Sequence, residues 1–485
     1  MFINFPIFKN FIIMSFKVIK FGGSNLQITT DFSRCAEIVR GYDAPCVIVL
    51  SAFFRVTDHL KEAALQASES GNFPRIFIEE FSEACFEQVK VNIDDDLLAE
   101  QTGKEVQALL DKLALLFRGI HAIGELPPTI YDTILSFGER ISAVIFDGVL
   151  RSKNLESSLC LPENFGLITD GEFGAASILL KESSKKIKGY FAAKQYYVVP
   201  GFYGISDEGK TTLLGRGGTD YSAAALAYLL DAESLDVWKD VDGFQTGDPK
   251  IVKNPQTIDF LSYNEAAELS YFGARILHPR TVEPLQPKNI PVRIFNIGSP
   301  SEKPGTVIGP DQGGDFSGPK SITFSRNFSV LKLKGPGVGI KPGVLAQVAG
   351  IMDSAGVNIS SVFTSQTAIC FLLQESDLKK ARKAIKAEAP ALISDVETIS
   401  DIALVALVGE GITKKQGIAA KAFQAVAAEN INVEIIAAGA STAAVYFVVK
   451  EIDCDRAVNA THGYFYPECP EQEQFRHSDL TSVVL

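Results

Sequence analysis

The stretch LLGRGGTDYSAAALAYLL, Leu213–Leu230, runs from a glycine-rich turn into a helix of alanine and leucine. Thr219 or Asp220 is placed to cap this helix, and the free amides at a helix N-terminus bind anions. The guanidinium of Arg216, set among three glycines, offers a planar fork for a carboxylate. A capped helix after a flexible loop would explain the aspartate but not the arginine. The stretch therefore predicts an anion site, in which Asp220 holds a magnesium ion or positions a lysine.

An apparent phosphate-binding motif lies just before this stretch and is set aside. Gly204–Thr211 reads GISDEGKT and matches G-x-x-x-x-G-K-[ST], which requires a strand before it and a helix directly after it. The glycine-rich turn follows instead, and Asp207 and Glu208 would repel phosphates. Since Ser-Asp-Glu-Gly suits a tight turn, we expect a β-hairpin between Val198–Tyr203 and Thr211–Leu214.

Strand-like and helix-like segments alternate on both sides of the stretch, between residues 17 and 310. Short apolar runs predict strands, and a 3.6-residue period predicts helices. Alternation of this kind favours a layered α/β domain with a largely parallel sheet. The expected strands are Lys17–Phe21, Cys46–Ser51, Val198–Pro200, Asp236–Trp238 and Pro291–Asn296, and the expected helices are 57–68, 96–117 and Tyr221–Leu230.

Two further motifs would suit a nucleotide. In KFGGSN, Lys20–Asn25, a strand ends in a cation and two glycines, whose amides approach an anion while the lysine neutralises a transferring phosphoryl group. In VWKDVDGFQTGDPK, Val237–Lys250, a strand enters an acidic turn. That turn either only shapes the backbone or lets Lys239 and Lys250 flank the phosphates. Each motif alone is also compatible with an ordinary turn.

Two titratable residues stand out in otherwise apolar surroundings. Glu139 in ILSFGERIS is a candidate for binding a substrate ammonium, although a glutamate near a helix start is often a partner of the helix dipole. His278 in FGARILHPRT precedes a proline, and a structural role is the simpler interpretation than that of a base.

The composition changes at GPDQGGDFSGPK, residues 309–320, which is typical of a linker. Beyond it lies an internal repeat with an offset of 74 residues, in which each copy has the pattern strand, loop, helix, turn, strand, strand. A unit of about 70 residues is small for an isolated core, so we expect the two copies to pack together. The matched positions are Gly335, Gly343 and Asn358 in the first copy and Gly409, Gly417 and Asn432 in the second.

The bulk composition of the 485 residues limits the partners. A net charge of −12 argues against nucleic acid, because a phosphate backbone needs a basic face. Seven scattered cysteines without zinc or redox spacing indicate buried thiols in a reducing compartment. Residues 1–13 lack the charged start and cleavage site of a secretory signal, and no apolar run reaches the roughly 18 residues of a membrane span. We expect a cytoplasmic protein.

These strings together resemble the aspartate kinases, in the order and spacing of that family and over about residues 16–466. VWKDVDG is similar to the monofunctional plant-type branch, and the repeat resembles the two ACT domains of the family, which bind regulatory amino acids. The strings that carry the resemblance are KFGGSN, SAFFRVTD, ILSFGERIS, LLGRGGTDYSAAALA, VWKDVDGFQTGDP and YNEAAELSYFGARILHPRT.

The resemblance implies phosphorylation of the aspartate β-carboxylate by ATP, with magnesium, to 4-phospho-L-aspartate. This is the first step towards lysine, threonine, methionine and diaminopimelate, with feedback by an end-product amino acid. The implied fold is an α/β amino-acid-kinase three-layer sandwich with a largely parallel sheet, plus two ferredoxin-like βαββαβ ACT domains, and paired ACT domains imply at least a homodimer. The implied divisions are an extension 1–15, a catalytic domain 16–310, a linker 311–325, ACT domains 326–398 and 399–466, and a tail 467–485.

The resemblance also implies roles for individual residues. Lys20, Arg216 and Asp220 would be catalytic, with Asp220 organising the lysine and the magnesium that accompanies ATP, and no direct metal ligand is assigned. Glu139 would bind the ammonium of aspartate and Arg216 its α-carboxylate, in a pocket shared with Ser51, Thr57 and Thr219. The implied nucleotide residues are Lys20, Gly22, Gly23, Ser24, Lys239, Asp240, Phe244, Lys250 and Arg275, and the implied effector residues are Ser360, Thr364, Ser365 and Gln366.

The chain departs from the family pattern at several positions. Arg55 replaces the usual glycine before Val-Thr, and Pro162–Asn164 replaces an Asp-x-Arg segment. Ser360 and Gln366 stand where carboxylates are common in lysine-sensitive members, which leaves lysine, threonine and S-adenosylmethionine open as effectors. Two alternatives remain: another kinase of the same fold, acting on glutamate or carbamate, or a non-enzymatic amino-acid sensor.

Overall fold

The computed structural model describes residues 16–53, 55–69, 73–187, 189–191, 195–274, 276–313, 318–388 and 391–467. These residues form two compact units. The first contains the described residues up to Phe244, Thr257–Tyr271 and 276–313, and the second contains Gln245–Gln256, Phe272–Ala274 and the described residues from 318 onwards. The expected extension 1–15 and residues 468–485 of the expected tail lie outside the described residues.

The first unit is built on an eight-stranded sheet in the order β3-β4-β2-β1-β7-β9-β10-β8. The first six strands in this order, which end with β9, run parallel, and β10 is antiparallel to β9. This confirms the predicted α/β class with a largely parallel sheet. The strands are β1 (Lys17–Phe21), β2 (Cys46–Leu50), β3 (Ser157–Leu159), β4 (Tyr196–Pro200), β7 (Ser234–Lys239), β8 (Phe260–Ser262), β9 (Val292–Asn296) and β10 (Thr306–Gly309), and a separate hairpin joins β5 (Tyr203–Ile205) to β6 (Thr211–Leu213).

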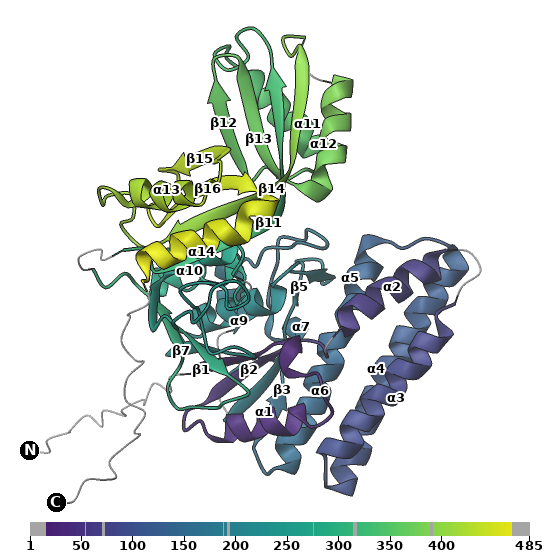
Figure 1. The fold of residues 1–485 in the computed structure, drawn as a ribbon. Coiled ribbons are helices and arrows are strands. Elements are labelled where there is room, and N and C mark those ends of the chain that lie inside the picture. The colour runs from purple at the N-terminus through teal and green to yellow at the C-terminus, as the bar shows by residue number, and fades with distance from the viewer. Residues whose placement is uncertain are drawn as a thin grey trace, which may run out of the picture. The chain divides into compact units, whose positions relative to one another are not determined.

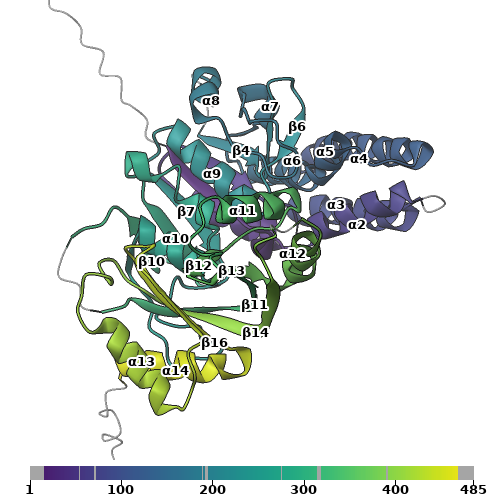
Figure 2. The ribbon, with the colours of Figure 1, turned by 90° about the horizontal axis from the view of Figure 1, so that it is seen from above.

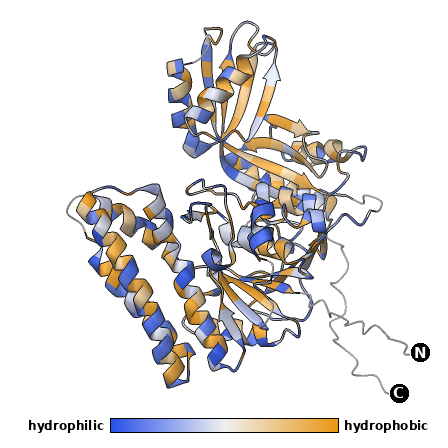
Figure 3. Ribbon diagram, turned by 180° about the vertical axis from the view of Figure 1, so that it is seen from behind, coloured by the Kyte–Doolittle hydropathy of each residue, from blue (hydrophilic) through white to orange (hydrophobic). Residues whose placement is uncertain are grey.

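Helices cover both faces of this sheet because side chains alternate along each strand. On β1, Phe21 faces the ring of Phe146, whereas Lys20 points to the opposite face and to Asp220. Every residue of β2 is buried, and Figure 3 shows the strands in the orange of apolar residues. The helices are α1 (Asp31–Arg40), α2 (Val56–Ser68), α3 (Arg75–Asn92), α4 (Asp96–Ile123), α5 (Pro128–Leu135), α6 (Phe137–Ser152), α7 (Pro162–Phe165), α8 (Leu180–Ile187), α9 (Gly218–Leu229) and α10 (Tyr263–Tyr271), with 3₁₀ turns η1 (Gly23–Asn25), η2 (Pro279–Thr281) and η3 (Gln286–Lys288).

The long helices α3 and α4 form a hairpin that extends the first unit (Figure 1), and Figure 2 shows the same pair side by side from above. The ring of Phe77 on α3 lies 6.1 Å from that of Phe117 on α4, measured between centroids. Phe81 and Val89 on α3 join the same apolar cluster as the sheet. The hairpin is therefore continuous with the core of this unit.

The second unit contains a six-stranded antiparallel sheet in the order β12-β13-β11-β14-β16-β15. The helices α11 and α13 begin directly after Gly343 and Gly417, which share a left-handed backbone and are equivalent in the predicted repeat. The repeat thus appears in the structure as two copies of one motif. The elements are β11 (Ser321–Lys334), α11 (Val344–Ser354), β12 (Ser361–Ser365), β13 (Ala368–Gln374), α12 (Glu375–Glu388), β14 (Asp395–Val408), α13 (Ile418–Ala428), β15 (Ile435–Ala438), β16 (Ala444–Lys450), η4 (Glu451–Asp453) and α14 (Cys454–Phe465).

The two copies share their central strands, which corrects the expected linker. β11 begins at Ser321, and its first part pairs with Leu404–Val408 while its last part pairs with Asp395–Thr398. The pairing register shifts near Asn327, which has a left-handed backbone. Residues 321–325 are therefore a strand of the second copy rather than linker, because the glycine- and proline-rich composition ends before them.

The expected continuous catalytic domain 16–310 is also interrupted. Val252 belongs to the apolar cluster of the second copy, together with Ile322 and Phe447. Ile322 donates a backbone hydrogen bond of 2.9 Å to Thr246, and the ring of Phe272 lies 5.1 Å from that of Tyr446. Gln245–Gln256 and Phe272–Ala274 thus belong to the second unit because their apolar side chains and backbone groups find partners there.

The helices over the described residues all lack the combination of length and apolar content that a bilayer crossing requires. The six cysteines in the same part of the chain carry free thiols, and five of them are buried.

Candidate active site

A cavity of about 310 Å³ opens in the first unit where β1 and β2 end. The loops after these two strands, the glycine-rich turn before α9 and the first turn of α6 form its wall. Nine of the predicted site residues meet there: Lys20, Gly23, Ser24, Ser51, Thr57, Glu139, Arg216, Thr219 and Asp220. The glycines of the predicted turn also line it, whereas the sequence did not predict Ala52, Phe53, Arg55, Asp58 and Phe202.

Two lysines share the carboxylate of Asp220 in the wall of this cavity. Lys20 Nζ lies 2.5 Å from Oδ1 of Asp220, and Lys239 Nζ lies 3.6 Å from Oδ2. Burial lowers the pKa of Lys20 to about 8, and Asp220 opposes that shift. Burial acts to raise the pKa of Asp220, but the two ammonium groups outweigh it and hold that pKa at about 2. The cluster therefore keeps a net positive charge at neutral pH.

The glycines on either side of Arg216 allow the tight turn that places its side chain at the cavity. Gly215 and Gly217 have φ of 75° and 72°, the left-handed region that glycine adopts without steric cost. A Cβ on Gly217 would lie 2.4 Å from Cβ of His278, so the histidine packs directly behind the turn. Arg216 is exposed to the cavity. This packing agrees with a structural role for His278, which stays a prediction.

Glu139 is a buried carboxylate without a full set of partners. It lies in the first turn of α6 and is 3 % exposed, and its Oε2 has no hydrogen-bond partner among the described residues. Burial raises its pKa to about 8, although hydrogen bonding from the backbone of Ala52 works against this shift. Leaving a buried polar atom unpaired costs free energy, so a cation from outside the protein would stabilise Glu139 here.

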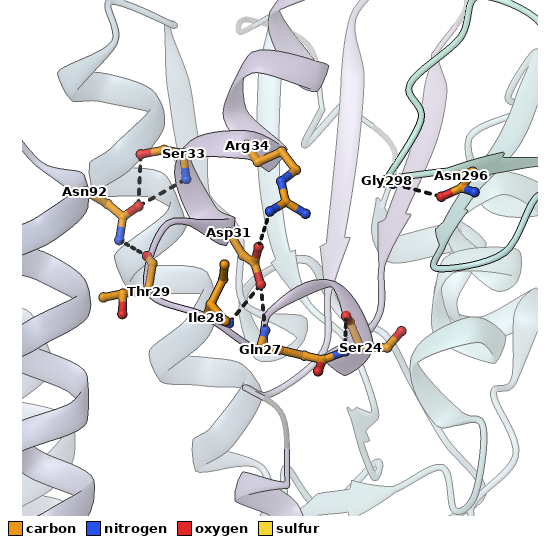
Figure 4. A network of polar contacts seen from close by, with 10 residues as sticks. All are labelled: Ser24, Gln27, Ile28, Thr29, Asp31, Ser33, Arg34, Asn92, Asn296 and Gly298. Carbon is orange, nitrogen blue, oxygen red and sulfur yellow. Dashed lines mark hydrogen bonds and ion pairs between the residues drawn. The ribbon is translucent and has the colours of Figure 1, made fainter.

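A network of polar contacts holds the loop that follows β1 (Figure 4). Oδ2 of Asp31 accepts hydrogen bonds from the amides of Gln27 and Ile28, at 2.8 and 2.9 Å, and Arg34 pairs with its other oxygen at 3.1 Å. Nearer the strand, Oδ1 of Asn25 accepts the amide of Gly22 at 2.8 Å. These bonds fix the backbone on which Gly23 and Ser24 face the cavity.

Asn92 at the end of α3 ties the same loop to the helical hairpin. Its Oδ1 accepts from the amide and the hydroxyl of Ser33, at 3.1 and 2.9 Å, and its Nδ2 donates to the carbonyl of Thr29 at 2.7 Å (Figure 4). The side chain is 2 % exposed. A buried amide that satisfies groups on two elements makes the loop position depend on α3.

Two polar contacts that the sequence did not reveal support the site from behind. Arg140 follows Glu139 on α6, pairs with Glu163 at 2.5 Å and lies over the ring of Tyr203. Oδ2 of Asp132 accepts the amide of Leu213 at 2.8 Å, two residues before the glycine-rich turn. Glu163 belongs to the segment that departs from the family pattern, and the structure shows that it neutralises a nearly buried arginine.

The predicted nucleotide residues are only partly brought together. Lys239 adjoins Asp220, and Asp240 is exposed just after β7. Phe244 is 1 % exposed, so its ring is part of the core, and Lys250 lies in a segment of the second unit. Arg275 lies outside the described residues.

The carboxylates of this site fit a magnesium ion that is bound mainly by the phosphates of a nucleotide. Among the described residues, no group of three or more His, Cys, Asp and Glu side chains is placed to bind a metal ion. Asp220 is paired with Lys20 and Lys239, so both its oxygens face ammonium groups. Mg²⁺ commonly uses one or two carboxylates together with substrate phosphates.

The predicted effector residues lie at the β12–β13 hairpin of the second unit. Thr364, Ser365 and Gln366 are exposed, and the amide of Ser360 donates to the carbonyl of Leu372 at 2.9 Å. A second cavity of about 330 Å³ in the same copy of the repeat lies at the start of α11, and the sequence did not predict its lining: Lys341, Pro342, Val344, Gln347, Ala391 and Leu392.

Comparison with known proteins adds a second line of evidence. The model of the amino acid kinase family matches residues 15–296, and the ACT domain model matches residues 331–388 and 405–465. The chain is 31% identical to the chloroplastic aspartokinase 1 of Arabidopsis thaliana, over 93% of this chain and 80% of the relative. It is 32% identical to the bifunctional aspartokinase/homoserine dehydrogenase of Haemophilus influenzae, of which it spans 56%.

Solved structures of similar fold include two complexes of one Escherichia coli enzyme. Aspartokinase III in complex with aspartate and ADP, an R-state structure, superimposes with a TM-score of 0.78 at 25% identity, covering 93% of this chain and 99% of that one. The same enzyme in complex with lysine and aspartate, a T-state structure, gives a TM-score of 0.75 at 26% identity, with the same coverage.

Proposed function

This chain belongs to the aspartokinase family, and we propose that it transfers the γ-phosphoryl group of ATP to the β-carboxylate of L-aspartate. The products are 4-phospho-L-aspartate and ADP. One observation carries the proposal: a buried carboxylate with an unpaired oxygen, Glu139, shares a cavity with an exposed guanidinium, Arg216, and with the Lys20–Asp220 pair. An amino acid with a second carboxylate matches that set of charges.

Aspartate is held by charge complementarity at its α-carbon. Its ammonium pairs with Glu139, which removes the cost of the unpaired oxygen, and its α-carboxylate pairs with the fork of Arg216. The hydroxyls of Ser51, Thr57 and Thr219 line the same cavity and offer hydrogen bonds. Fixing both ends of the small substrate aims its side-chain carboxylate at the phosphoryl donor.

The transfer needs positive charge rather than a base. The attacking oxygen belongs to a carboxylate that is ionised at pH 7, so no proton has to be removed. The difficulty is that two anions must meet, and Lys20 with the amides of the loop after β1 neutralises the transferring group. Asp220 favours the protonated form of Lys20 despite its burial.

The nucleotide lies against the ends of β1 and β7 in this proposal. Gly23 and Ser24 provide backbone amides, and Gly22, whose amide is bonded to Asn25, shapes the loop that presents them. Lys239 adds a second charge, and Asp240 lies beside it. Magnesium bound to the phosphates of ATP would supply further neutralisation. Phe244 contributes indirectly in this proposal, because its ring is buried and its amide and carbonyl are bonded to Thr306 and Ile258.

Regulation is assigned to the ACT domains. The two copies bind an end-product amino acid, lysine or threonine, and the enzyme is a dimer or larger through them. Residues 360–366 on the β12–β13 hairpin are the effector contacts in this proposal. The solved complex of aspartokinase III with lysine and aspartate supports an amino-acid effector in a relative of this chain.

The test is a hydroxamate assay on the full-length protein. With ATP, magnesium, aspartate and hydroxylamine, we expect aspartyl hydroxamate, because hydroxylamine traps an acyl phosphate. Product with glutamate but not with aspartate would contradict the proposal, and no product with either would favour a sensor without enzymatic activity. Adding lysine, threonine or S-adenosylmethionine to the same assay identifies the effector.

A further inference from the structure

Arg55, in the loop between β2 and α2, has a backbone conformation that its residue type disfavours. Its φ and ψ are 65° and 0°, the left-handed region, where a Cβ costs about 1 kcal/mol or more. Nine non-glycine residues of the described chain have a positive φ, and seven of them are Asn or Asp, which tolerate it best. The other two, Arg55 and Phe202, both line the cavity of the active site.

Phe202 is held by packing and a hydrogen bond. The side chain of Arg55 has no such hydrogen bond among the described residues. The carbonyl of Phe202 accepts the amide of Leu214 at 2.9 Å, and its ring packs against Gly218. The side chain of Arg55 is exposed to the cavity, and the described residues provide it with no ion pair or hydrogen bond. The turn accounts for the backbone of Arg55, because the amide of Val56 donates to the carbonyl of Phe53 at 3.1 Å, but it does not require an arginine side chain. The guanidinium is therefore the reason for an arginine at this position.

The charges around the cavity indicate what this guanidinium meets. Asp220 is already shared by two lysines, and Glu139 and Arg216 are assigned to the ammonium and one carboxylate of the substrate. Aspartate brings a second carboxylate, and Arg55 is the cation that remains unassigned among the described residues of the wall. Asp58, also in the wall, lies in the first turn of α2, where its charge complements the helix dipole.

We infer that Arg55 binds the side-chain carboxylate of aspartate through the oxygen that does not attack phosphorus. This inference rests on the proposed function and adds a substrate-binding residue to it. A guanidinium has five N–H donors, so Arg55 can donate to one carboxylate oxygen and leave the other free to attack. Arg55 would therefore orient the attacking carboxylate. It would also select for aspartate, whose side-chain carboxylate lies closer to its ammonium than that of glutamate does.

The variant Arg55→Gly separates binding from folding, because glycine adopts the left-handed backbone at no steric cost. We expect its Tm to equal or exceed that of the parent and its kcat/KM for aspartate to fall about tenfold or more, with Arg55→Lys intermediate. The KM for ATP should change less than twofold. The inhibition constant of asparagine, which lacks the side-chain carboxylate, should also be unchanged. Asn154→Gly is the matched control, since it replaces another left-handed residue away from the cavity.

Three outcomes would overturn the inference: a kcat/KM of Arg55→Gly within twofold of the parent, an equal loss of asparagine binding, or a rise in the KM for ATP. Calorimetric titration of aspartate into parent and variant measures the same contact without turnover. An inactive parent protein would contradict the proposed function, whereas an active parent with an unaffected Arg55→Gly variant would contradict only the role of Arg55.

Discussion

Lys20 at the end of β1 and Asp220 in the first turn of α9 form a buried ion pair, with Nζ 2.5 Å from Oδ1. Neither residue is more than 6 % exposed. Parallel strands end at one edge of a sheet, and α9 begins at that edge, so two segments far apart in sequence meet over the cavity. Lys239 approaches the other oxygen of Asp220, which makes this aspartate the counter-ion of two cations.

Asp220→Asn should leave Lys20 and Lys239 facing each other without a counter-ion. We expect the unfolding free energy to fall by about 3 kcal/mol or more, as for other buried pairs that lose one partner, and kcat to fall at least 100-fold. Urea denaturation and the hydroxamate assay measure the two effects. Asp231→Asn, which removes an exposed partner of Lys288, is the control and should cost less than about 1 kcal/mol. Equal losses in both variants would contradict the role given to Asp220.

The pKa of Glu139 predicts a pH dependence of stability. Its folded-state pKa is raised to about 8, above the unfolded value near 4.5, so its contribution is fully present below pH 4.5. That contribution is lost as pH rises to 8, because burial then opposes ionisation. Without ligand, the parent should lose more unfolding free energy between pH 5 and 8 than Glu139→Gln does, as measured by urea denaturation. If the unfolding free energies of the two proteins change equally with pH, the pKa of Glu139 is not raised by folding.

The same shift predicts how aspartate binding depends on pH. An ammonium pairs with ionised Glu139, so the KM for aspartate should fall as pH rises towards 8, with proton release on binding. Glu139→Gln should raise that KM at least tenfold and flatten its pH profile, while the KM for ATP stays the same. If the KM for aspartate of Glu139→Gln still depends steeply on pH, a group other than Glu139 causes the pH dependence.

Gly217→Ala should disable the turn that carries Arg216. The added Cβ would meet His278 at 2.4 Å on a backbone with φ of 72°. We expect kcat/KM for aspartate to fall at least 100-fold and stability to fall by about 2 kcal/mol. Gly209→Ala is a matched control, since its φ is 76° but nothing lies within 4 Å of the added atom. It should lose about 1 kcal/mol and keep its activity, and an inactive control would point to backbone strain instead of the collision.

Asn92→Ala should make the loop after β1 less ordered, although Asn92 does not line the cavity. The substitution removes bonds to Ser33 and Thr29 and leaves buried partners unpaired, which costs about 2 kcal/mol in unfolding free energy. Because the loop also carries Gly23 and Ser24, the KM for ATP should rise more than that for aspartate. Gln107→Ala on the exposed side of α4 is the control and should cost at most about 0.5 kcal/mol. A purely structural role for Asn92 would leave both KM values unchanged.

Much of the fold and of the site was predictable from local patterns. Apolar runs predicted the strands β1, β2, β4, β7 and β9, and the 74-residue offset predicted two ACT copies. Strand–glycine–helix turns marked Lys20 and Arg216. These features depend on neighbours in the chain. Arg55 was noticed only as a departure from the family pattern, because its left-handed backbone has no local sequence signal beyond the glycine that it replaces.

Other features of the structure could not be predicted, because the deciding partners are distant in sequence. Residues 321–325 look like the end of a linker, but they complete a sheet with Leu404–Val408. Phe244 resembles a ring that lines a nucleotide site, and it is buried in the core. Glu163 is explained by Arg140, on a different helix.

The sequence by itself determined the elements, the repeat and the chemical groups available, since backbone propensity, periodicity and charge are local properties. The tertiary structure alone decided that Asp220 pairs with two lysines, that Glu139 keeps an unpaired buried oxygen, and that Arg55 lines the same cavity as both. Burial and pairing depend on which distant segments pack together. The charge balance of the site, and the pKa values that follow from it, therefore arise only on folding.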